Sequence, residues 1–252
     1  MKWRLVEEQP YTASMNMAID HAIYESVANG REKPTIRFYK WQNPSVSIGA
    51  YQDWKEINLD ACKKHRIDIV RRMTGGRAVF HDKTDFTYSV IAHIRVFNYS
   101  IEKAYKETCL CIINALSGLG IKADLENRND VLVEGKKISG NAAKAMEKGV
   151  YLQHGTLAYN GNNKTATEVL NVPKELIEEK ATSILKHKRL SHKRVYDELK
   201  QSFVFGKDHE SGKISQYELI RAEELTRTKY NTIILAPDSF VKNKGACYVE
   251  RG

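Results

Sequence analysis

Apolar residues recur along this chain with the two periods that distinguish strands from helices. Runs rich in β-branched and aromatic residues predict strands, and apolar spacings of three and four predict helices. The predicted strands are residues 3–8, 35–41, 45–51, 67–72, 78–82, 85–94, 131–134, a segment through Lys137 and Ser139, and 150–159. The predicted helices are a segment capped by Thr12 or Ser14, then 58–65, 101–119, 164–170, 174–180, 193–203 and 216–229.

The connections between these segments predict how the elements are arranged. Asn29-Gly30 is a stop signal for the first helix. Gln42-Asn43-Pro44 separates the runs 35–41 and 45–51 and predicts a hairpin between them. The strands cluster in the first 160 residues and alternate irregularly with two large helices. The pattern therefore predicts an α/β (α+β) fold, a mixed sheet with helices on its faces.

Composition narrows the class of protein without choosing a function. The chain has 252 residues, 28% of them charged, with a formal net charge of +9. This charge permits an anionic partner such as nucleic acid, a phosphorylated substrate or an acidic protein. The N-terminus lacks the apolar run of a signal peptide, and no window reaches the length of a membrane span. The four cysteines form no Cys-x-x-Cys pair. These features predict a cytoplasmic protein with reduced thiols and no membrane partner.

A basic, glycine-containing stretch at residues 71–82 is the first candidate site. It reads Arg-Arg-Met-Thr-Gly-Gly-Arg-Ala-Val-Phe-His-Asp. Gly75 and Gly76 allow the backbone to approach a ligand closely, so that successive N–H groups can converge on an anion. The arginines offer planar donor groups that suit phosphate oxygens. A plain β-turn with basic residues at its rim explains the stretch equally well.

A second group of motifs decides between these interpretations. The chain continues with Asn129-Asp130, then Lys-Ile-Ser-Gly at 137–140, then His-Gly-Thr at 154–156. Together with the stretch at 71–82, the four motifs in this order resemble the lipoate–protein ligase A family. The resemblance covers roughly residues 1–235 and implies that family's catalytic domain. Residues 236–252 lack helix caps and strong periodicity, and they are predicted as a C-terminal tail in which disorder is one outcome.

The resemblance implies a fold and a set of site residues. The fold is that of biotin and lipoate ligases and class II aminoacyl-tRNA synthetases, with a largely antiparallel sheet. Lys137 is implied as the catalytic residue, and Asp130 as a ligand for Mg²⁺. The residues implied to bind nucleotide or lipoyl-AMP are Arg72, Thr74, Gly75, Gly76, Arg77, Ala78, Val79, Phe80, His81, Asn129, Asp130, Lys137, Ser139, Gly140, Asn141 and His154.

Several of these roles have alternatives in the sequence itself. Strand alternation places Lys137 and Ser139 on one face, but the pattern alone does not separate Lys137 from Lys136. His81 and His154 could each be an ordinary core histidine. The acyl chain needs an apolar slot, and its candidate wall is Val46, Ile48, Gly49 and Tyr51.

The cysteines bear on which reaction of this superfamily is expected. By resemblance, ligases use ATP, whereas octanoyl- or lipoyl-transferases pass the acyl group through a cysteine thioester. No cysteine occurs between Cys111 and Cys247, so a thiol near Lys137 is not expected. The sequence analysis therefore predicts an ATP-dependent lipoate–protein ligase that forms lipoyl-AMP from lipoate and MgATP. The alternatives are an octanoyl/lipoyl transferase, then a biotin ligase, and, from another class, a nucleic-acid-binding protein.

The resemblance also implies partners. The acceptors would be lipoyl-carrier proteins, namely the lipoyl domains of 2-oxo-acid dehydrogenases and the glycine-cleavage carrier protein. Larger family members carry an accessory domain, and this chain is too short to contain one, which predicts a separate accessory subunit for the activation step. The basic run at 186–194 lacks interleaved aromatic residues, so no nucleic-acid partner is expected. Gly118-x-Gly120 follows a predicted helix, so it is interpreted as a helix end rather than a dinucleotide motif.

Overall fold

The computed structural model describes residues 1–7, 9–145 and 147–230, and it contains one large and one small β-sheet. The large sheet has the strand order β11-β1-β2-β6-β10-β9-β8-β7. The strands β11, β1 and β2 run parallel to one another, and all the other pairs in this sheet are antiparallel. The bounds of its strands are β1 Trp3–Glu7, β2 Thr35–Tyr39, β6 Phe86–His93, β7 Asp124–Glu126, β8 Asp130–Val133, β9 Lys136–Ala145, β10 Val150–Leu157 and β11 His209–Gly212. The predicted mixed, largely antiparallel sheet is confirmed.

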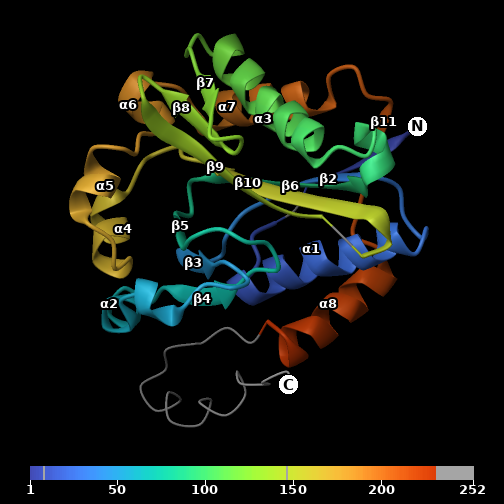
Figure 1. Ribbon diagram of the computed structural model, residues 1–252, viewed down its shortest axis with the longest axis horizontal. Helices are drawn as coiled ribbons and strands as arrows, with labels where there is room; N and C mark the ends of the chain where they lie inside the picture. Colours follow the sequence, from blue (N-terminus) through green and yellow to red (C-terminus); the bar gives the residue numbers. More distant parts are fainter. Residues whose placement is uncertain (8, 146, 231–252) are drawn as a thin grey trace.

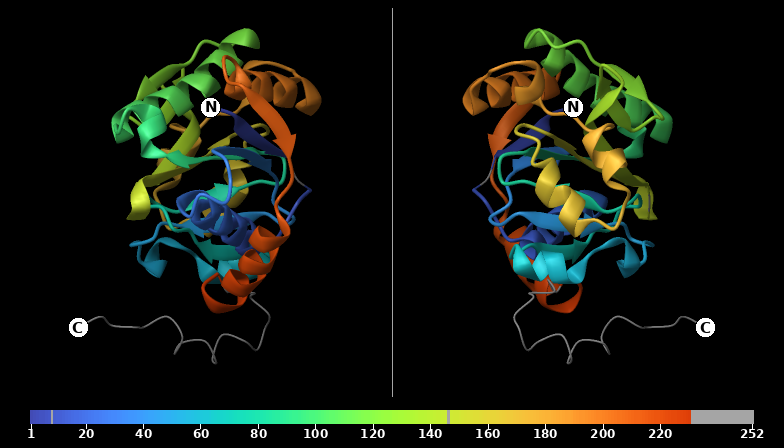
Figure 2. Two further views of the ribbon diagram at one scale, coloured as in Figure 1. Left: turned by 90° about the vertical axis from the view of Figure 1, so that its right-hand side faces the viewer. Right: turned by 90° about the vertical axis from the view of Figure 1, so that its left-hand side faces the viewer.

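Helices cover both faces of the large sheet (Figures 1 and 2). On one face lie α3 (Ile101–Gly118) and α7 (His192–Val204), which enclose a core with the sheet residues Phe38, Tyr88 and Tyr151. On the other face lie α1 (Ala13–Ala28) and α8 (Gln216–Thr228). The remaining helices are α2 Leu59–Lys64, α4 Asn163–Val169, α5 Lys174–Glu178 and α6 Ile184–His187, with short 3₁₀ turns at Trp54–Glu56, Ile94–Phe97 and Glu147–Gly149.

The small sheet lies on the same side as α1 (Figure 1). Its order is β4-β3-β5, with bounds Asp68–Arg71, Ser45–Ile48 and Val79–His81. The hairpin predicted around Gln42-Asn43-Pro44 is therefore wrong, because β2 pairs with β1 and β6 whereas β3 pairs with β4 and β5. The apolar faces of these two strands belong to different cores, and a local turn signal cannot show which partner each strand will choose.

Helix boundaries agree closely with the capping signals. Of the two candidates for the first N-cap, the structure selects Thr12, whose side chain accepts the backbone N–H of Met15. Asn29 is the C-cap of that helix. Gly120 follows the end of α3 with a positive φ of 75°, so the Gly-x-Gly stretch is a helix end as predicted. The strands β7 and β11 and the helix α6 have no strong apolar pattern, and the sequence analysis did not predict them.

The tail predicted at 236–252 lies outside the described residues. Among the described residues, no helix is both long enough and apolar enough to cross a membrane.

Candidate functional site

A cavity of about 330 Å³ lies on the sheet face that α1 and the small sheet cover. One row of residues crosses the large sheet beneath it. Hydrogen-bonded register places Tyr39 opposite Thr87, Thr87 opposite Thr156, Thr156 opposite Gly140, and Gly140 opposite Asp130. Register partners share a face of the sheet, so all five face the cavity, and all five line it. Four strand spacings of about 4.8 Å make the row roughly 19 Å long, which gives the cavity two distinct ends.

The end at β8 and β9 is polar. The Nζ atom of Lys137 lies 2.8 Å from Oδ1 of Asp130. The Lys137 side chain keeps 45% of its surface exposed, so its cation can still reach a ligand. Asn129 and Asn141 hold the two strands together, because each side-chain amide donates to the other's backbone oxygen, at 3.1 and 3.0 Å. This end of the cavity therefore offers a positioned cation.

A β-bulge sets the direction of the Lys137 side chain. Lys137 pairs with Leu132 and Ser139 pairs with Val131, so Ile138 is an extra residue in β9. Because Leu132 and Val131 face opposite sides, Lys137 and Ser139 do too, and the predicted shared face is wrong. Simple alternation fails at any bulge. As a result Lys137 lines the cavity, whereas Ser139 is buried away from it.

The backbone of Lys137 is also held from its other side. Its N–H donates to the carbonyl of Lys180 at 2.7 Å, and its carbonyl accepts the N–H of Thr182 at 2.9 Å. The segment between α5 and α6 thus adds a strand-like bridge beside Lys137. No motif or periodicity in the sequence indicates this contact, which joins positions more than forty residues apart.

Gly140 gives the Lys137 side chain the space that it occupies. A Cβ atom at Gly140 would lie 2.6 Å from Cε and 2.8 Å from Nζ of Lys137. We expect Gly140→Ala to fold, because the flexible lysine end can move away. A misplacement of about 1 Å can cost roughly 100-fold in rate, so activity should fall by one to two orders of magnitude. If Gly140→Ala acts through Lys137, adding it to Lys137→Ala should cost little more than Lys137→Ala alone, and an additive loss in this double-mutant cycle would contradict that explanation.

The end of the cavity near α1 and β2 is largely apolar. Met17, Trp41 and Val79 line it. The indole of Trp41 stacks on His81 with ring centroids 4.2 Å apart, and its N–H donates to the Thr87 hydroxyl at 2.9 Å. Burial, together with the nearby cation of Arg72, lowers the pKa of His81 well below its ordinary value. This end therefore presents a neutral imidazole and hydrocarbon surface, which suit an acyl chain.

Arg72 lines the cavity, but its donors are used within the protein. Its five N–H donors are matched by five acceptors: the Thr74 hydroxyl, the carbonyl and hydroxyl oxygens of Ser47, and the carbonyls of Gly75 and Arg77. Burial lowers its pKa to about 10, so it remains a cation at neutral pH. The guanidinium holds the turn through the carbonyls of Gly75 and Arg77, and its predicted contact with a phosphate stays a prediction. Arg77 is the exposed arginine of this stretch, and it pairs with Glu56.

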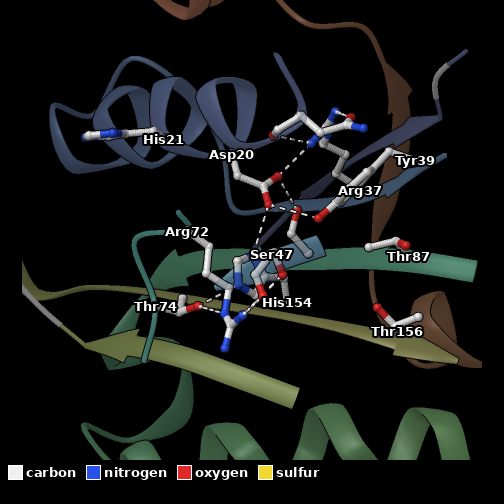
Figure 3. Close-up of polar contacts among 12 residues, drawn as sticks. Asp20, His21, Arg37, Tyr39, Ser47, Arg72, Thr74, Thr87, His154 and Thr156 are labelled. Carbon is white, nitrogen blue, oxygen red and sulfur yellow. Dashed lines mark hydrogen bonds and ion pairs between the residues drawn. The ribbon is translucent and has the colours of Figure 1, made fainter. Parts of the chain in front are cut away.

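A buried polar network joins α1 to this turn (Figure 3). Asp20 on α1 accepts a hydrogen bond from Arg37 at 2.8 Å and lies 3.3 Å from Nδ1 of His154. Nε2 of His154 lies 2.6 Å from the Thr74 hydroxyl. Burial alone would raise the pKa of Asp20, but the charge of Arg37 and the contact with His154 outweigh it and lower that pKa. Asp20 and Arg37 carry no motif of their own, so the sequence analysis missed them.

The structure brings most of the predicted site residues to one cavity. Those that line it are Arg72, Gly76, Arg77, Ala78, Val79, His81, Asn129, Asp130, Lys137, Gly140, Asn141 and His154. Thr74, Gly75, Phe80 and Ser139 do not. The predicted acyl wall does not line the cavity either: Val46 and Ile48 are buried in the core of the small sheet, Gly49 contacts the backbone of Gly76, and Tyr51 is 96% exposed. Strand alternation in β3 directs its apolar side chains into that core.

Neither metal ligands nor thiols are grouped at the cavity within the described chain. The described residues contain no group of three or more His, Cys, Asp or Glu side chains that could hold a metal ion. Asp130, the predicted Mg²⁺ ligand, pairs with Lys137. Of the cysteines, Cys62 lies in the core of the small sheet and Cys109 is buried on α3. A second cavity, of about 350 Å³, lies beside α7 and contains none of the predicted site residues.

Comparison with known proteins assigns the family. The model of the lipoyl protein ligase A/B catalytic domain matches residues 12–204. This chain belongs to that family, and the predicted resemblance is confirmed.

The relatives include both reaction types of the superfamily. The chain is 32% identical to octanoyltransferase LipM of Brevibacillus brevis, over 92% of this chain and 97% of that protein. It is 31% identical to a lipoate-protein ligase A solved with ATP, with a TM-score of 0.82 over 91% of this chain and 96% of the other. It is 30% identical to a bi-partite lipoate protein ligase of Thermoplasma acidophilum, described with its E2 lipoyl domain, with a TM-score of 0.78 over 90% and 92%.

The prediction of an ATP-dependent lipoate ligase is wrong. Curated relatives that match 81–92% of this chain are octanoyltransferases. The prediction depended on the lack of a cysteine near Lys137, and a missing residue type is a weaker guide to the reaction than similarity over nearly the whole chain. The expected requirement for ATP and Mg²⁺ loses its basis with it.

Proposed function

We propose that this protein transfers an octanoyl group from a thioester donor to a lysine of a lipoyl-carrier protein. The observation that carries the proposal is the two-ended cavity, with the Lys137–Asp130 pair at one end and an apolar slot at the other. The similarity to octanoyltransferases supports the acyl group, and membership of a lipoyl protein ligase family supports the acceptor. Lipoyl domains of 2-oxo-acid dehydrogenases and the glycine-cleavage carrier protein are the candidate acceptors.

In this proposal the acyl chain lies along the apolar end, and its carbonyl lies at Lys137. The acceptor lysine, as a free amine, attacks the carbonyl carbon. Negative charge then develops on the carbonyl oxygen, and the Lys137 cation stabilises it. The new C–N bond forms as the C–S bond breaks. The leaving thiolate takes up one proton to become a thiol, and the amine loses one proton on becoming an amide, so the step balances.

The lipoyl-carrier proteins in this proposal meet a strongly basic enzyme. The net charge of +9 would accelerate encounter with an acidic acceptor domain.

The domain bounds 1–235, the separate accessory subunit and the cytoplasmic location all stay predictions.

The test is mass spectrometry of an apo lipoyl-carrier protein after incubation with the chain. One reaction receives octanoyl-loaded acyl carrier protein, and the other receives octanoate with MgATP. We expect the octanoyl mass on the carrier only in the first reaction. Product only with octanoate and MgATP, or in neither reaction, would overturn the proposal.

Cys109, a thiol on α3 in the core on the opposite face of the sheet, is not expected to take part. It is fully buried, it lies 3.9 Å from the amide nitrogen of Gln153, and burial raises its pKa to about 12. We expect Cys109→Ala to keep the wild-type rate while it lowers the free energy of unfolding by about 1 kcal/mol. Rates and thermal melts of the two proteins check this. An inactive but folded variant, together with loss of an octanoyl adduct seen on the wild-type chain, would show that Cys109 carries the acyl group.

A further inference from the structure

The polar network between α1 and the Thr-Gly-Gly turn forms a continuous buried chain. It consists of Arg37, Asp20, His154, Thr74 and Arg72, called here the buried relay. Exposed fractions are 0% for Arg37 and Thr74, 1% for Asp20, 5% for Arg72 and 7% for His154. The consecutive contacts measure 2.8, 3.3, 2.6 and 3.2 Å. Figure 3 shows these side chains converging from α1, two strands of the large sheet and the turn.

Donor and acceptor chemistry fixes the direction of the hydrogen bonds that Asp20 and Arg72 make in the relay. The Asp20 carboxylate accepts hydrogen bonds from Arg37 and from the Ser89 hydroxyl. Because a carboxylate can only accept, Nδ1 of His154 must be protonated and donate to Asp20. At the other end, Nε of Arg72 can only donate to the Thr74 hydroxyl. The hydroxyl hydrogen of Thr74 is then available to Nε2 of His154. The arrangement is self-consistent with a neutral His154 protonated on Nδ1.

The relay ends on the wall of the cavity. Besides Thr74, Arg72 binds the carbonyls of Gly75 and Arg77, at 2.7 and 2.9 Å. The segment Gly76, Arg77 and Ala78, called here the turn wall, lines the cavity. Thr74 itself does not, although its side chain orients both Arg72 and His154. A change at Thr74 therefore reaches a ligand only through other residues.

We propose that Thr74 and Asp20 are positioning residues, which set the ring orientation of His154 and the conformation of the turn wall against which the acyl donor binds. The inference rests on the proposed transfer function, because it assigns the acyl donor to this cavity. It predicts that loss of the Thr74 hydroxyl changes the kinetics of the octanoyl donor and leaves the KM for the carrier protein unchanged.

Two variants at Thr74 separate the hydroxyl from the shape of the side chain. Thr74→Val keeps the shape but leaves Nε2 of His154 and Nε of Arg72 without their partner, whereas Thr74→Ser keeps the hydroxyl. Loss of a buried hydrogen bond of this kind should lower kcat/KM for the octanoyl donor about 10- to 100-fold in Thr74→Val. The KM for the lipoyl-carrier protein should stay unchanged, and Thr74→Ser should restore most of the loss. Equal losses in Thr74→Val and Thr74→Ser, or no change in either, would overturn the proposal, as would a fall in kcat alone with both KM values unchanged.

A second measurement uses the wild-type chain and does not depend on a variant that folds. In the ¹⁵N spectrum of histidine-labelled protein, His154 should show the shifts of the Nδ1-protonated tautomer, with its signal assigned by its loss in His154→Gln. An Nε2-protonated ring would overturn the relay. If the wild-type chain transfers no octanoyl group, the proposed function fails, but this spectrum still decides whether the relay exists.

Discussion

Lys137→Ala should lose almost all transfer activity while keeping its fold. The Nζ atom supplies the cation at the polar end of the cavity, and removal of one such charge-stabilising donor costs about 100- to 1,000-fold in kcat. The remaining partner, Asp130, retains 23% exposure of its side chain, so water can solvate its carboxylate. The measurement is the initial rate of octanoyl transfer at saturating donor and carrier, with circular dichroism to confirm folding.

The neighbouring lysine provides the matched control. Lys136 is also exposed but does not line the cavity, so Lys136→Ala should keep the wild-type rate. Lys137→Arg keeps the charge but changes the geometry, and it should recover only part of the activity. Equal losses in Lys136→Ala and Lys137→Ala would point to a general effect of surface charge and would contradict a specific role for Lys137.

Asp20→Asn should cause the largest loss of stability among the changes considered. The substitution removes the negative charge that lies 2.8 Å from the fully buried guanidinium of Arg37. Breaking a buried ion pair from one side costs about 3 to 5 kcal/mol. Urea denaturation of the variant and the wild type measures this difference. Asp124→Asn, at an exposed position of the edge strand β7, is the control, and it should change the free energy of unfolding by less than about 0.5 kcal/mol.

The same pair makes wild-type stability depend on acid. Burial by itself raises the pKa of Asp20, but Arg37 and His154 lower it by more. Its folded pKa therefore lies below the unfolded value of about 4. The stabilisation is therefore fully present above that unfolded value, and it is lost as pH falls through the folded pKa. Between about pH 5 and pH 2, the wild-type protein should lose stability more steeply than Asp20→Asn does. Parallel pH profiles would show that folding does not lower the pKa of Asp20.

The motifs predicted residues that the structure brings into one cavity, because each motif is local in sequence. Lys137, Asp130 and the turn at 74–76 each lie within a short signature, and the structure places Lys137 and Asp130 in one cavity. The direction of side chains was harder to predict. One extra residue in β9 reversed the expected relation of Lys137 to Ser139, and a bulge has no reliable local signal. For Arg72, residue type alone predicted a ligand contact, whereas its donors are used within the protein.

The sequence by itself determined most of the helices, most of the strands and the family. These depend on periodicity, capping and short motifs, all of which act over a few residues. Only the tertiary structure decided that β2 and β3 join different sheets, that Tyr39, Thr87, Thr156, Gly140 and Asp130 form one row, and that Asp20 meets His154. The physical reason is that strand pairing and buried charge pairing join residues far apart in the chain, where each partner is chosen by packing and by hydrogen bonding across the whole sheet.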